Sequence, residues 1–534
     1  RLNDAGIMVI VAAGNDTSSS VSNQYGENLP LTADPDNSIV GAPSTYAANL
    51  SVASVDGAHA YHRYFLLGDE QVKYTDSQTT WLGIPDFVKL LTYLQISIEE
   101  PYEYVMVPGY GRASDYEGLD VTGKIAVVNR GGENEDGTPM TFVNKIQNAT
   151  WMNAIGIIVC NNDTENPDDC NLMMSTGYYQ LPACFVSYHA GQRLAEMEGK
   201  GVGITLKTEF LTEENPTAGQ MSSFTSIGVT PDLRLKPEIS AVGGNVYSSV
   251  PMLSKQGDYA VMSGTSMACP YVAGASALVK QRIAKDWTAV QPNQVAPMTE
   301  NLMMSTSQII YDPATGLPYT PRLQGSGQID LNAAMESPVC LFTEADVYGD
   351  TKPVANLGDD VEKTGKYTIS FYAQNLSQDV SAEYEVDVIA MSPDVEKREG
   401  YDLMSQHDVL LDYSVSGDKK VTLAPAGEQT KVSVTITLTE QQKAELDKAF
   451  ENGIFVEGFV RLTPVHSGTA PVLRAPFVAF YGDWSQPGMF DYATMLNDQE
   501  VPYSNYATAI GSWFSFMAVK PVSYTHLRAH ETSA

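Results

Sequence analysis

Positive charge is scarce in this sequence. Its 534 residues include 32 Lys and Arg against 64 Asp and Glu, which gives a formal net charge of −32 at pH 7. A protein that binds nucleic acid or an anionic membrane through its charge needs a basic patch or stripe. We therefore expect neither nucleic acid nor an anionic lipid surface among the partners of this protein.

Long hydrophobic runs and cysteines are scarce as well. No apolar run reaches the ~18 residues of a membrane-spanning helix, so we expect no membrane span. The five cysteines are at positions 160, 170, 184, 269 and 340, and an odd number gives no disulfide framework. A Cys160–Cys170 bridge stays open, because spacing does not give its geometry. The spacing predicts no zinc site, and we identify no metal site.

The stretch "VMSGTSMACPYVAGASALV" (261–279) joins a run of hydroxyl side chains to small residues. A buried helix to about Asp286 is predicted by apolar residues at helical spacing, namely Val272, Ala275, Val279 and Ile283. Pro270 is tolerated only near a helix start, which places the N-terminus close to Ser266.

A nucleophile at this helix start would lie among backbone N–H groups that lack intrahelical partners, where a developing oxyanion is stabilised. The alternative is that Ser263, Thr265 and Ser266 merely cap the helix. Capping explains one of these residues but not the whole run of small ones, which indicates close approach by another backbone.

The segment "GTSMACPYVAGASAL" (264–278) resembles the nucleophile motif of the subtilisin-like serine proteases. The resemblance implies that Ser266 is the nucleophile. Cys269 and Tyr271 stand where many relatives have Ser and His, but neither position belongs to the catalytic triad.

A second segment, "AGIMVIVAAGNDTSS" (5–19), reads as a buried strand that leads into a tight turn. Resemblance to the same family implies that Asn15 donates its side-chain amide to the oxyanion. The alternative is a plain turn Asn, but the pairing with the Ser266 motif favours the functional interpretation. The family also implies a substrate cleft lined by the backbones of "VAAG" and "SGTS", which gives Ala12, Ala13, Gly14, Gly264 and Thr265 as substrate-binding residues.

Two further segments agree with this resemblance. "MSSFTSIGVTPDLRLKPEISAVGGNVYSS" (221–249) resembles the family's stretch ahead of the nucleophile, although Val242 and Gly243 stand where a Pro is usual. "GAPSTYAANLSVASVDG" (41–57) resembles the strand between the Asn and nucleophile segments.

The general base of such a protease is missing. The family places Asp and then His ahead of the Ser in the chain, with the His in an "HGTH" context. None of the seven histidines has this context; they are His59, His62, His189, His407, His466, His526 and His530. The sequence begins with "RLNDAGIMVI", a helix end that runs into a core strand, without a signal peptide. We expect a fragment that lacks the catalytic Asp and His.

An insertion of roughly 150 residues separates the Asn15 and Ser266 segments. It contains a Gly-flanked strand in "VTGKIAVVNRGG" (121–132), a helix with Phe142, Ile146 and Ala149 on one face, and the strand "IGIIVC" (155–160). The pattern resembles a protease-associated domain, an insert that shapes access to the active site in large subtilisin-like proteases.

After about Pro338 the sequence alternates polar and apolar residues, as in "KYTISFYAQN" and "GIFVEGFVRLTP". This pattern predicts a β-sandwich with strands exposed on one face. "FVEGFVRLTP" and "LRAPFVAFYGDW" (473–484) resemble the fibronectin type III-like domain of cell-envelope proteinases, the lactocepins and streptococcal complement-cleaving peptidases. A generic sandwich of no family is the alternative.

The predicted fold is therefore an N-terminally truncated α/β subtilisin-like parallel-sheet domain with an inserted α+β protease-associated domain, followed by an all-β sandwich. The predicted domains are the first part of the catalytic domain (1–60), the insertion (61–215, core about 100–210), the second part with the nucleophile (216–340), the sandwich (341–484), the start of a further truncated domain (485–521) and a non-native tail (522–534).

We expect an extracellular serine endopeptidase, secreted or attached to a bacterial cell wall, that acts on protein or peptide substrates as a monomer. The fragment itself is expected to be inactive. No cofactor is expected; family resemblance allows calcium, but we identify no calcium site. The alternatives are a non-catalytic surface adhesin on a degenerate protease scaffold, and a purely structural wall protein.

Overall fold

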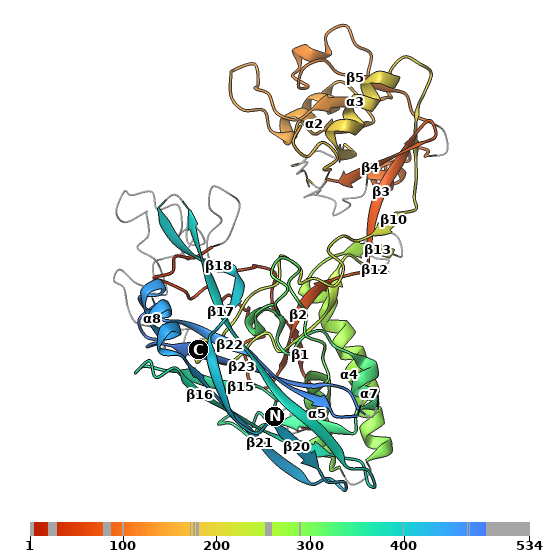
Figure 1. The fold of residues 1–534 in the computed structure, drawn as a ribbon. Helices are drawn as coiled ribbons and strands as arrows, with labels where there is room; N and C mark the ends of the chain where they lie inside the picture. Colours follow the sequence, from red (N-terminus) through yellow and green to blue (C-terminus); the bar gives the residue numbers. More distant parts are fainter. Residues whose placement is uncertain are drawn as a thin grey trace. The chain divides into compact units, whose positions relative to one another are not determined.

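A computed structural model gives the fold of the chain (Figure 1). The residues that it describes are 5–19, 29–77, 87–98, 101–170, 172, 174, 177, 181–250, 259–287, 290–398, 400–466, 468 and 470–487. The predicted further domain lies outside these residues except for 485–487, and the predicted non-native tail lies wholly outside them.

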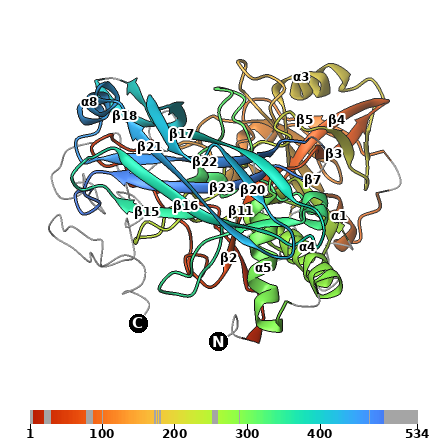
Figure 2. The ribbon, with the colours of Figure 1, turned by 60° about the horizontal axis from the view of Figure 1, so that its bottom comes forward.

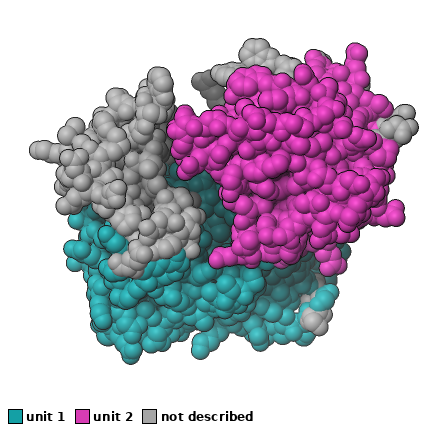
Figure 3. Space-filling model, turned by 90° about the horizontal axis from the view of Figure 1, so that it is seen from above, with its two compact units in different colours: residues 1–58, 217–246, 262–534 teal, residues 59–216, 247–261 magenta. Residues whose placement is uncertain are grey.

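The chain divides into two compact units, which Figure 3 colours separately. Unit 1 comprises residues 1–58, 217–246 and 262–534, and unit 2 comprises residues 59–216 and 247–261. The chain leaves unit 1 after residue 58 and returns to it at residue 217. These two points lie close together, because the Thr217 hydroxyl donates to the Asp56 carboxylate over 2.5 Å.

The core of unit 1 is a parallel sheet in the order β1 (Ile10–Ala12), β2 (Leu50–Asp56) and β11 (Ile239–Gly244). The central strand β2 is buried along almost its whole length, as expected for a parallel strand covered on both faces. Two helices contact this sheet, α4 (Thr265–Asp286) and α6 (Pro321–Gln324), while α5 (Pro292–Ser305) and α7 (Leu331–Glu336) pack against α4.

The helix predicted from the small-residue stretch is confirmed as α4. It begins at Thr265 and ends at Asp286, with Val272, Ala275, Val279 and Ile283 buried against the sheet. Among the described residues, no helix is long and apolar enough to span a membrane.

Unit 2 is an α+β body around one mixed sheet. The strand order is β10-β3-β4-β8-β7-β6-β5, and β9 also pairs with β3. The strands are β3 (His59–Leu67), β4 (Glu70–Asp76), β5 (Tyr104–Met106), β6 (Ile125–Asn129), β7 (Gly156–Cys160), β8 (Ala183–Val186), β9 (Ile204–Leu206) and β10 (Leu211–Glu214). The helices are α1 (Phe87–Tyr93), η2 (Ser114–Tyr116), α2 (Phe142–Trp151) and α3 (Tyr188–Met197).

Two predictions about this unit can be checked directly. The helix with Ile146 and Ala149 on its buried face is confirmed as α2, and the apolar strand after it as β7. Cys160 and Cys170 are both buried free thiols, so this structure contains no bridge between them.

A hairpin of unit 2 leads into the segment that carries Ser266. It consists of β12 (Val246–Ser249) and β13 (Tyr259–Met262). The Tyr247 ring lies 5.5 Å from Tyr259 on the partner strand, 5.6 Å from Phe210 and 5.6 Å from Tyr61 on β3, between ring centroids. Aromatic packing therefore holds this hairpin against Tyr61 of β3 and against Phe210.

The C-terminal part of unit 1 is a β-sandwich (Figure 2). One sheet has the order β14-β16-β21-β19, and the other β15-β23-β22-β17-β18 with β20 on β17. The elements are β14 (Val339–Phe342), β15 (Ala355–Asp359), β16 (Lys366–Asn375), β17 (Ala382–Arg398), β18 (Tyr401–Leu410), β19 (Tyr413–Gly417), β20 (Lys420–Leu423), β21 (Gln429–Leu438), α8 (Glu440–Ala449), β22 (Ile454–Pro464) and β23 (Leu473–Tyr481).

The prediction of one exposed face holds for β16 but is wrong for β22 and β23. Along β16, buried positions alternate with more exposed ones. In β23 every residue is buried, and β22 is buried from Ile454 to Val460. The reason is a second contact surface, because Phe455, Val478 and Phe480 pack into the same core as α4 and α5.

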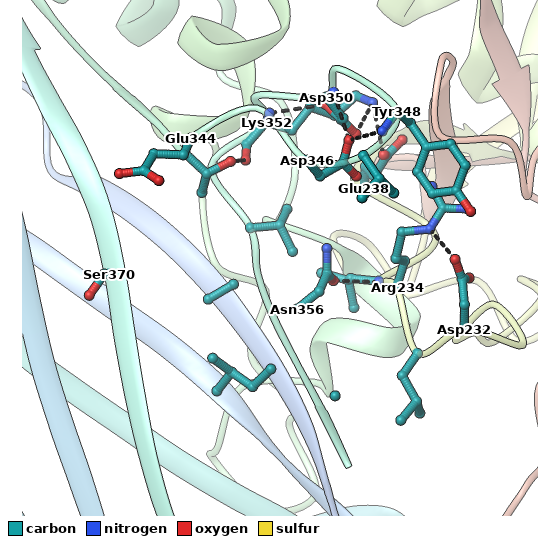
Figure 4. A pocket seen from close by; sticks show the side chains of 18 of the residues that line it. Asp232, Arg234, Glu238, Glu344, Asp346, Tyr348, Asp350, Lys352, Asn356 and Ser370 are labelled. Carbon is teal, nitrogen blue, oxygen red and sulfur yellow. Dashed lines mark hydrogen bonds and ion pairs between the residues drawn. The ribbon is translucent and has the colours of Figure 1, made fainter.

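Two buried ionic groups join this sandwich to the parallel-sheet core. Arg322 of α6 directs Nε at both carboxylate oxygens of Glu457 on β22, at 3.0 and 3.1 Å, and its guanidinium lies 3.9 Å from the centre of the Phe455 ring. Lys352, ahead of β15, pairs with Glu238 at 3.1 Å and with Asp350 at 3.0 Å, as Figure 4 shows.

We predict that Glu457→Ala lowers the free energy of unfolding by about 3–5 kcal/mol, because it leaves the buried Arg322 guanidinium without its anion. Replacing both partners, as Arg322→Met with Glu457→Leu, should recover most of this loss. Urea denaturation measures both changes, and Glu385→Ala at an exposed position of β17 is the control. A loss below about 1 kcal/mol for Glu457→Ala contradicts the prediction.

Candidate active site

The turn after β1 carries Asn15, one residue beyond Gly14. Gly14 has φ of +117°, and a Cβ there would lie 2.6 Å from the Ser226 hydroxyl oxygen. Ser226 holds the turn from the other side, since its N–H donates to the Gly14 carbonyl and its hydroxyl accepts from the Asp16 N–H, both over 3.1 Å. Glycine is therefore required at position 14 for two independent reasons.

The start of α4 orients the Asn15 side chain. The backbone N–H and the hydroxyl of Thr265 both donate to Asn15 Oδ1 over 2.9 Å. The Thr265 hydroxyl also accepts from the Gly14 N–H over 3.2 Å. Thr265 is fully buried whereas Asn15 is exposed. Because the carbonyl end of the carboxamide is held inward, the Nδ2 end is left as the donor.

A small open space lies between Asn15 and the helix start. A Cβ built on Gly264 would lie 3.4 Å from Asn15 Nδ2, 3.7 Å from the backbone nitrogen of Ser266 and 3.7 Å from the Met267 sulfur. The same space therefore borders two nitrogen donors at the positive end of α4, where an anionic oxygen is favoured. Any side chain at position 264 would occupy it.

Ser266 is exposed at the first turn of α4, ahead of the buried Ala268 and Val272. Cys269 supports this turn, since its thiol donates to the Ile10 carbonyl of β1 over 3.2 Å. Burial raises the pKa of the Cys269 thiol, so the thiol keeps its proton. Tyr271, the other departure from the family motif, is exposed.

The segment ahead of Ser266 is fixed by β11. The Gly264 N–H donates to the Gly243 carbonyl over 2.9 Å, and the Asn245 N–H donates to the Ser263 hydroxyl over 2.9 Å. The pairing of β11 with β2 shifts register between Val242 and Gly244, at the position where the family usually has Pro. A bulge there re-aims the end of the strand toward the Ser263–Ser266 segment.

The structure brings most of the predicted site residues together in unit 1. Asn15, Gly14, Gly264, Thr265 and Ser266 form one connected group. Ala12 ends β1 beside them. Ala13 is fully buried, and its backbone N–H and C=O bond to Val52 and Gly41, so its side chain lies behind the surface of this group.

Sequence reasoning missed Ser226 and named Ser263 only as a possible helix cap, whereas Ser226 braces the Asn15 turn and Ser263 bonds to Asn245 ahead of Ser266. Ser226 lies in a segment that was assigned to the family without a role for this residue. No local pattern in the sequence reveals its contact with Gly14, because Gly14 and Ser226 are far apart in the chain.

No histidine is hydrogen-bonded to Ser266 among the described residues. His189 contacts Asp168 over 2.9 Å, His407 contacts Asp312 over 2.5 Å, and His59 and His62 lie on β3 in unit 2. In the described part of the chain, no cluster of three or more His, Cys, Asp or Glu side chains is arranged to hold a metal ion.

Comparison with known families gives two matches. The model described as the subtilase family matches residues 1–327, and the model described as an Fn3-like domain matches residues 357–478.

Similar proteins come from bacteria. A PII-type proteinase of Lacticaseibacillus paracasei is 27% identical over 92% of this chain and 25% of its own length. A C5a peptidase of Streptococcus pyogenes serotype M1 is 26% identical over 90% of this chain and 36% of its own length. The chain thus spans a quarter to just over a third of these relatives. Among solved structures, a zinc aminopeptidase from Bacillus subtilis matches 31% of this chain and 33% of its own at 13% identity, with a TM-score of 0.19, too low for a conclusion about the fold.

The turn at Gly14 gives a stability prediction. Gly14→Ala should lower the free energy of unfolding by about 2 kcal/mol or more, because the new Cβ meets the Ser226 hydroxyl and the positive φ is strained. Gly274→Ala is the matched control, since that exposed position inside α4 has open space around it and should gain about 0.5–1 kcal/mol. Thermal and urea unfolding measure both; similar effects of the two variants would contradict the assigned packing.

Proposed function

The chain belongs to the subtilase family, and from this membership we propose that Ser266 is the nucleophile of a serine endopeptidase that hydrolyses peptide bonds in proteins. The observation that carries the proposal is the open space at Gly264, which borders both Asn15 Nδ2 and the Ser266 nitrogen. Two nitrogen donors that border one position, at the helix start that carries Ser266, match the needs of a tetrahedral oxyanion.

In the proposed mechanism, the Ser266 hydroxyl oxygen attacks the carbonyl carbon of the substrate and gives its proton to a general base. The carbonyl oxygen becomes the oxyanion and accepts from Asn15 Nδ2 and the Ser266 N–H. The C–N bond then breaks, the amine leaves with the proton from the base, and an acyl-enzyme remains on Ser266. Water then takes the place of the amine: it attacks the acyl carbon and gives a proton to the base. The ester bond to Ser266 breaks, the acid is released, and the base returns the proton to the Ser266 oxygen.

We propose that the general base and its orienting carboxylate come from residues outside this sequence. In this family they are an Asp and a His that precede the Ser in the chain, and among the described residues no His is bonded to Ser266. The substrate-facing positions would be the backbones around Gly14, Gly264 and Thr265, with Ala12 and Ala13 forming the wall behind them.

Unit 2 is proposed to be a protease-associated domain that controls which substrates reach Ser266. Its support is a compact fold that is inserted between β2 and β11. By likeness to the PII-type proteinase and C5a peptidase, we propose that the protein is secreted or attached to the cell wall of a bacterium and cleaves protein substrates.

The Asn15 proposal is tested in a longer form of the protein that supplies the general base. Asn15→Ala removes an interaction made mainly in the transition state, so kcat should fall by roughly 10²–10³ with KM little changed, a magnitude known from subtilisin. Asn15→Asp should be as damaging or worse, because a carboxylate repels the oxyanion. A plain turn residue would tolerate Asp, so near-normal kcat in Asn15→Asp overturns the assignment.

The role of unit 2 is tested by deleting residues 64–208 from the same longer protein, which keeps Tyr61 and Phe210 against Tyr247. The pairing of His62 with Leu211 allows a short linker to join the cut ends. We expect kcat/KM to change more for folded protein substrates than for short peptides, because an access-controlling unit acts only on large substrates. Equal losses on both substrate sizes would show that unit 2 is needed for the core itself.

A further inference from the structure

We propose that a cavity between α5 and the β-sandwich of unit 1 binds a neutral oligosaccharide. The cavity has a volume of about 680 Å³, within the range of small-molecule binding sites. Its walls come from the end of α4, from α5, from β14 and β16, and from residues 426–429. It therefore lies where the parallel-sheet core and the sandwich meet.

This cavity is distinct from the proposed catalytic group. Ser266 is at the first turn of α4, and Trp287, which lines the cavity, directly follows the last. At 1.5 Å per residue, the helix separates the two positions by roughly 30 Å. A ligand in the cavity would leave Ser266 free, so the proposal does not depend on the catalytic one.

The polar part of the lining consists mainly of carboxamides. Among the described residues, six of them contribute: Asn293, Gln294, Asn301, Gln374, Gln378 and Gln429. A carboxamide carries both a donor and an acceptor, which is the pairing that a hydroxyl group, itself a donor and an acceptor, requires. Three of them already use one end within the protein: Gln294 Oε1 accepts from the Gln291 N–H, and the Nε2 groups of Gln374 and Gln378 donate to the Gly427 and Leu376 carbonyls. Gln294, Met298 and Asn301 follow one another at helical spacing and so share one face of α5.

Asn301 adds an independent sign that a ligand is missing. Asn301 is only 6% exposed, and its Oδ1 has no hydrogen-bond partner among the described residues. Its Nδ2 makes a long contact of 3.5 Å with the Thr351 hydroxyl. A buried carbonyl oxygen without a donor costs about 1–3 kcal/mol, and a ligand hydroxyl at the inner wall would remove this cost.

The charged residues at the cavity make an ionic ligand unfavourable. Among the described lining residues the one carboxylate is Asp286, and Arg282 Nε lies 3.7 Å from it. None of these described residues is Lys, Arg or His. An anion would therefore meet only a like charge, and a cation would have to compete with Arg282 for one partly exposed carboxylate.

The lining also disfavours a purely apolar ligand, because such a ligand would bury the carboxamides without partners. β14 is the end strand of its sheet, so a peptide that adds to its edge as a β-strand is the competing ligand, and the test includes a peptide probe for that reason. Trp287, Met298 and Phe342 supply apolar surface for the C–H faces of sugar rings, while the carboxamides meet the hydroxyl groups. The Arg282 guanidinium lies 4.4 Å from the centre of the Trp287 ring, and Phe342 stacks on Tyr372, so a sugar would use the other face of each ring.

The test is isothermal titration calorimetry of the 534-residue chain with two neutral probes, maltotriose and chitotriose. We expect at least one to bind 1:1 with Kd below ~10 mM, the weak affinity usual for a site of few hydrogen bonds. Asn301→Leu should weaken binding at least tenfold while the thermal midpoint is unchanged or higher, because Leu has a similar size and removes the unpaired carbonyl.

Two surface variants complete the design. Gln429→Ala, at an exposed position of the lining, should weaken binding several-fold, and Gln281→Ala, an exposed residue of α4 outside the lining, should leave it unchanged. Absence of binding by both probes overturns the proposal, as does binding that survives Asn301→Leu. Binding of a neutral peptide such as Gly-Gln-Ser-Gly with equal or higher affinity would also overturn it and assign the cavity to peptides.

Discussion

A carboxamide can donate to a negative charge only when its carbonyl end is held away from that charge, and in this protein Thr265 holds it. Both donors of Thr265 end on Asn15 Oδ1, and Thr265 is itself fully buried. Since Asn15 follows β1 and Thr265 begins α4, this contact fixes a strand end against a helix start. The proposed oxyanion site depends on that one constraint.

Other features of unit 1 serve the same geometry. Gly14 and Gly264 keep side chains out of the two places where the chain segments approach most closely. The small residues early in α4, such as Ala268, let the helix lie directly on β2 and β11, so that its N-terminus reaches the ends of these strands. Small side chains bury little area and so contribute little hydrophobic free energy. They are needed here because only small side chains allow the helix to pack this closely on the strands.

The sequence was sufficient to predict the features that depend on residues close together in the chain. The bounds of α4 and its buried face follow from periodicity and Pro270, and the turn at Asn15 follows from its Gly-Asn pair. The family and the sandwich were recognised from contiguous segments for the same reason. The roles assigned to Asn15 and Ser266, and the domain boundaries, stay predictions.

The rest could not be read from the sequence, because it depends on residues that are distant in the chain. Ser226 beneath Gly14 and Glu457 opposite Arg322 carry no local signal of their partners. The alternation rule failed for β22 and β23 because it assumes that one face of a strand meets water. A polar lining such as that around Asn301 likewise forms only when α5 and the sandwich meet.

The burial of β22 and β23 on both faces has a consequence for how the protein can change in evolution. Fn3-like modules that are joined by a linker can be duplicated, lost or exchanged without harm to their neighbours. Here Phe455, Phe480 and Trp484 complete the core under α4 and α5, so the parallel-sheet part of unit 1 would expose its interior if this sandwich were removed. The domain boundary in the sequence is therefore not a boundary of cooperative unfolding, and the two parts are constrained to be inherited together.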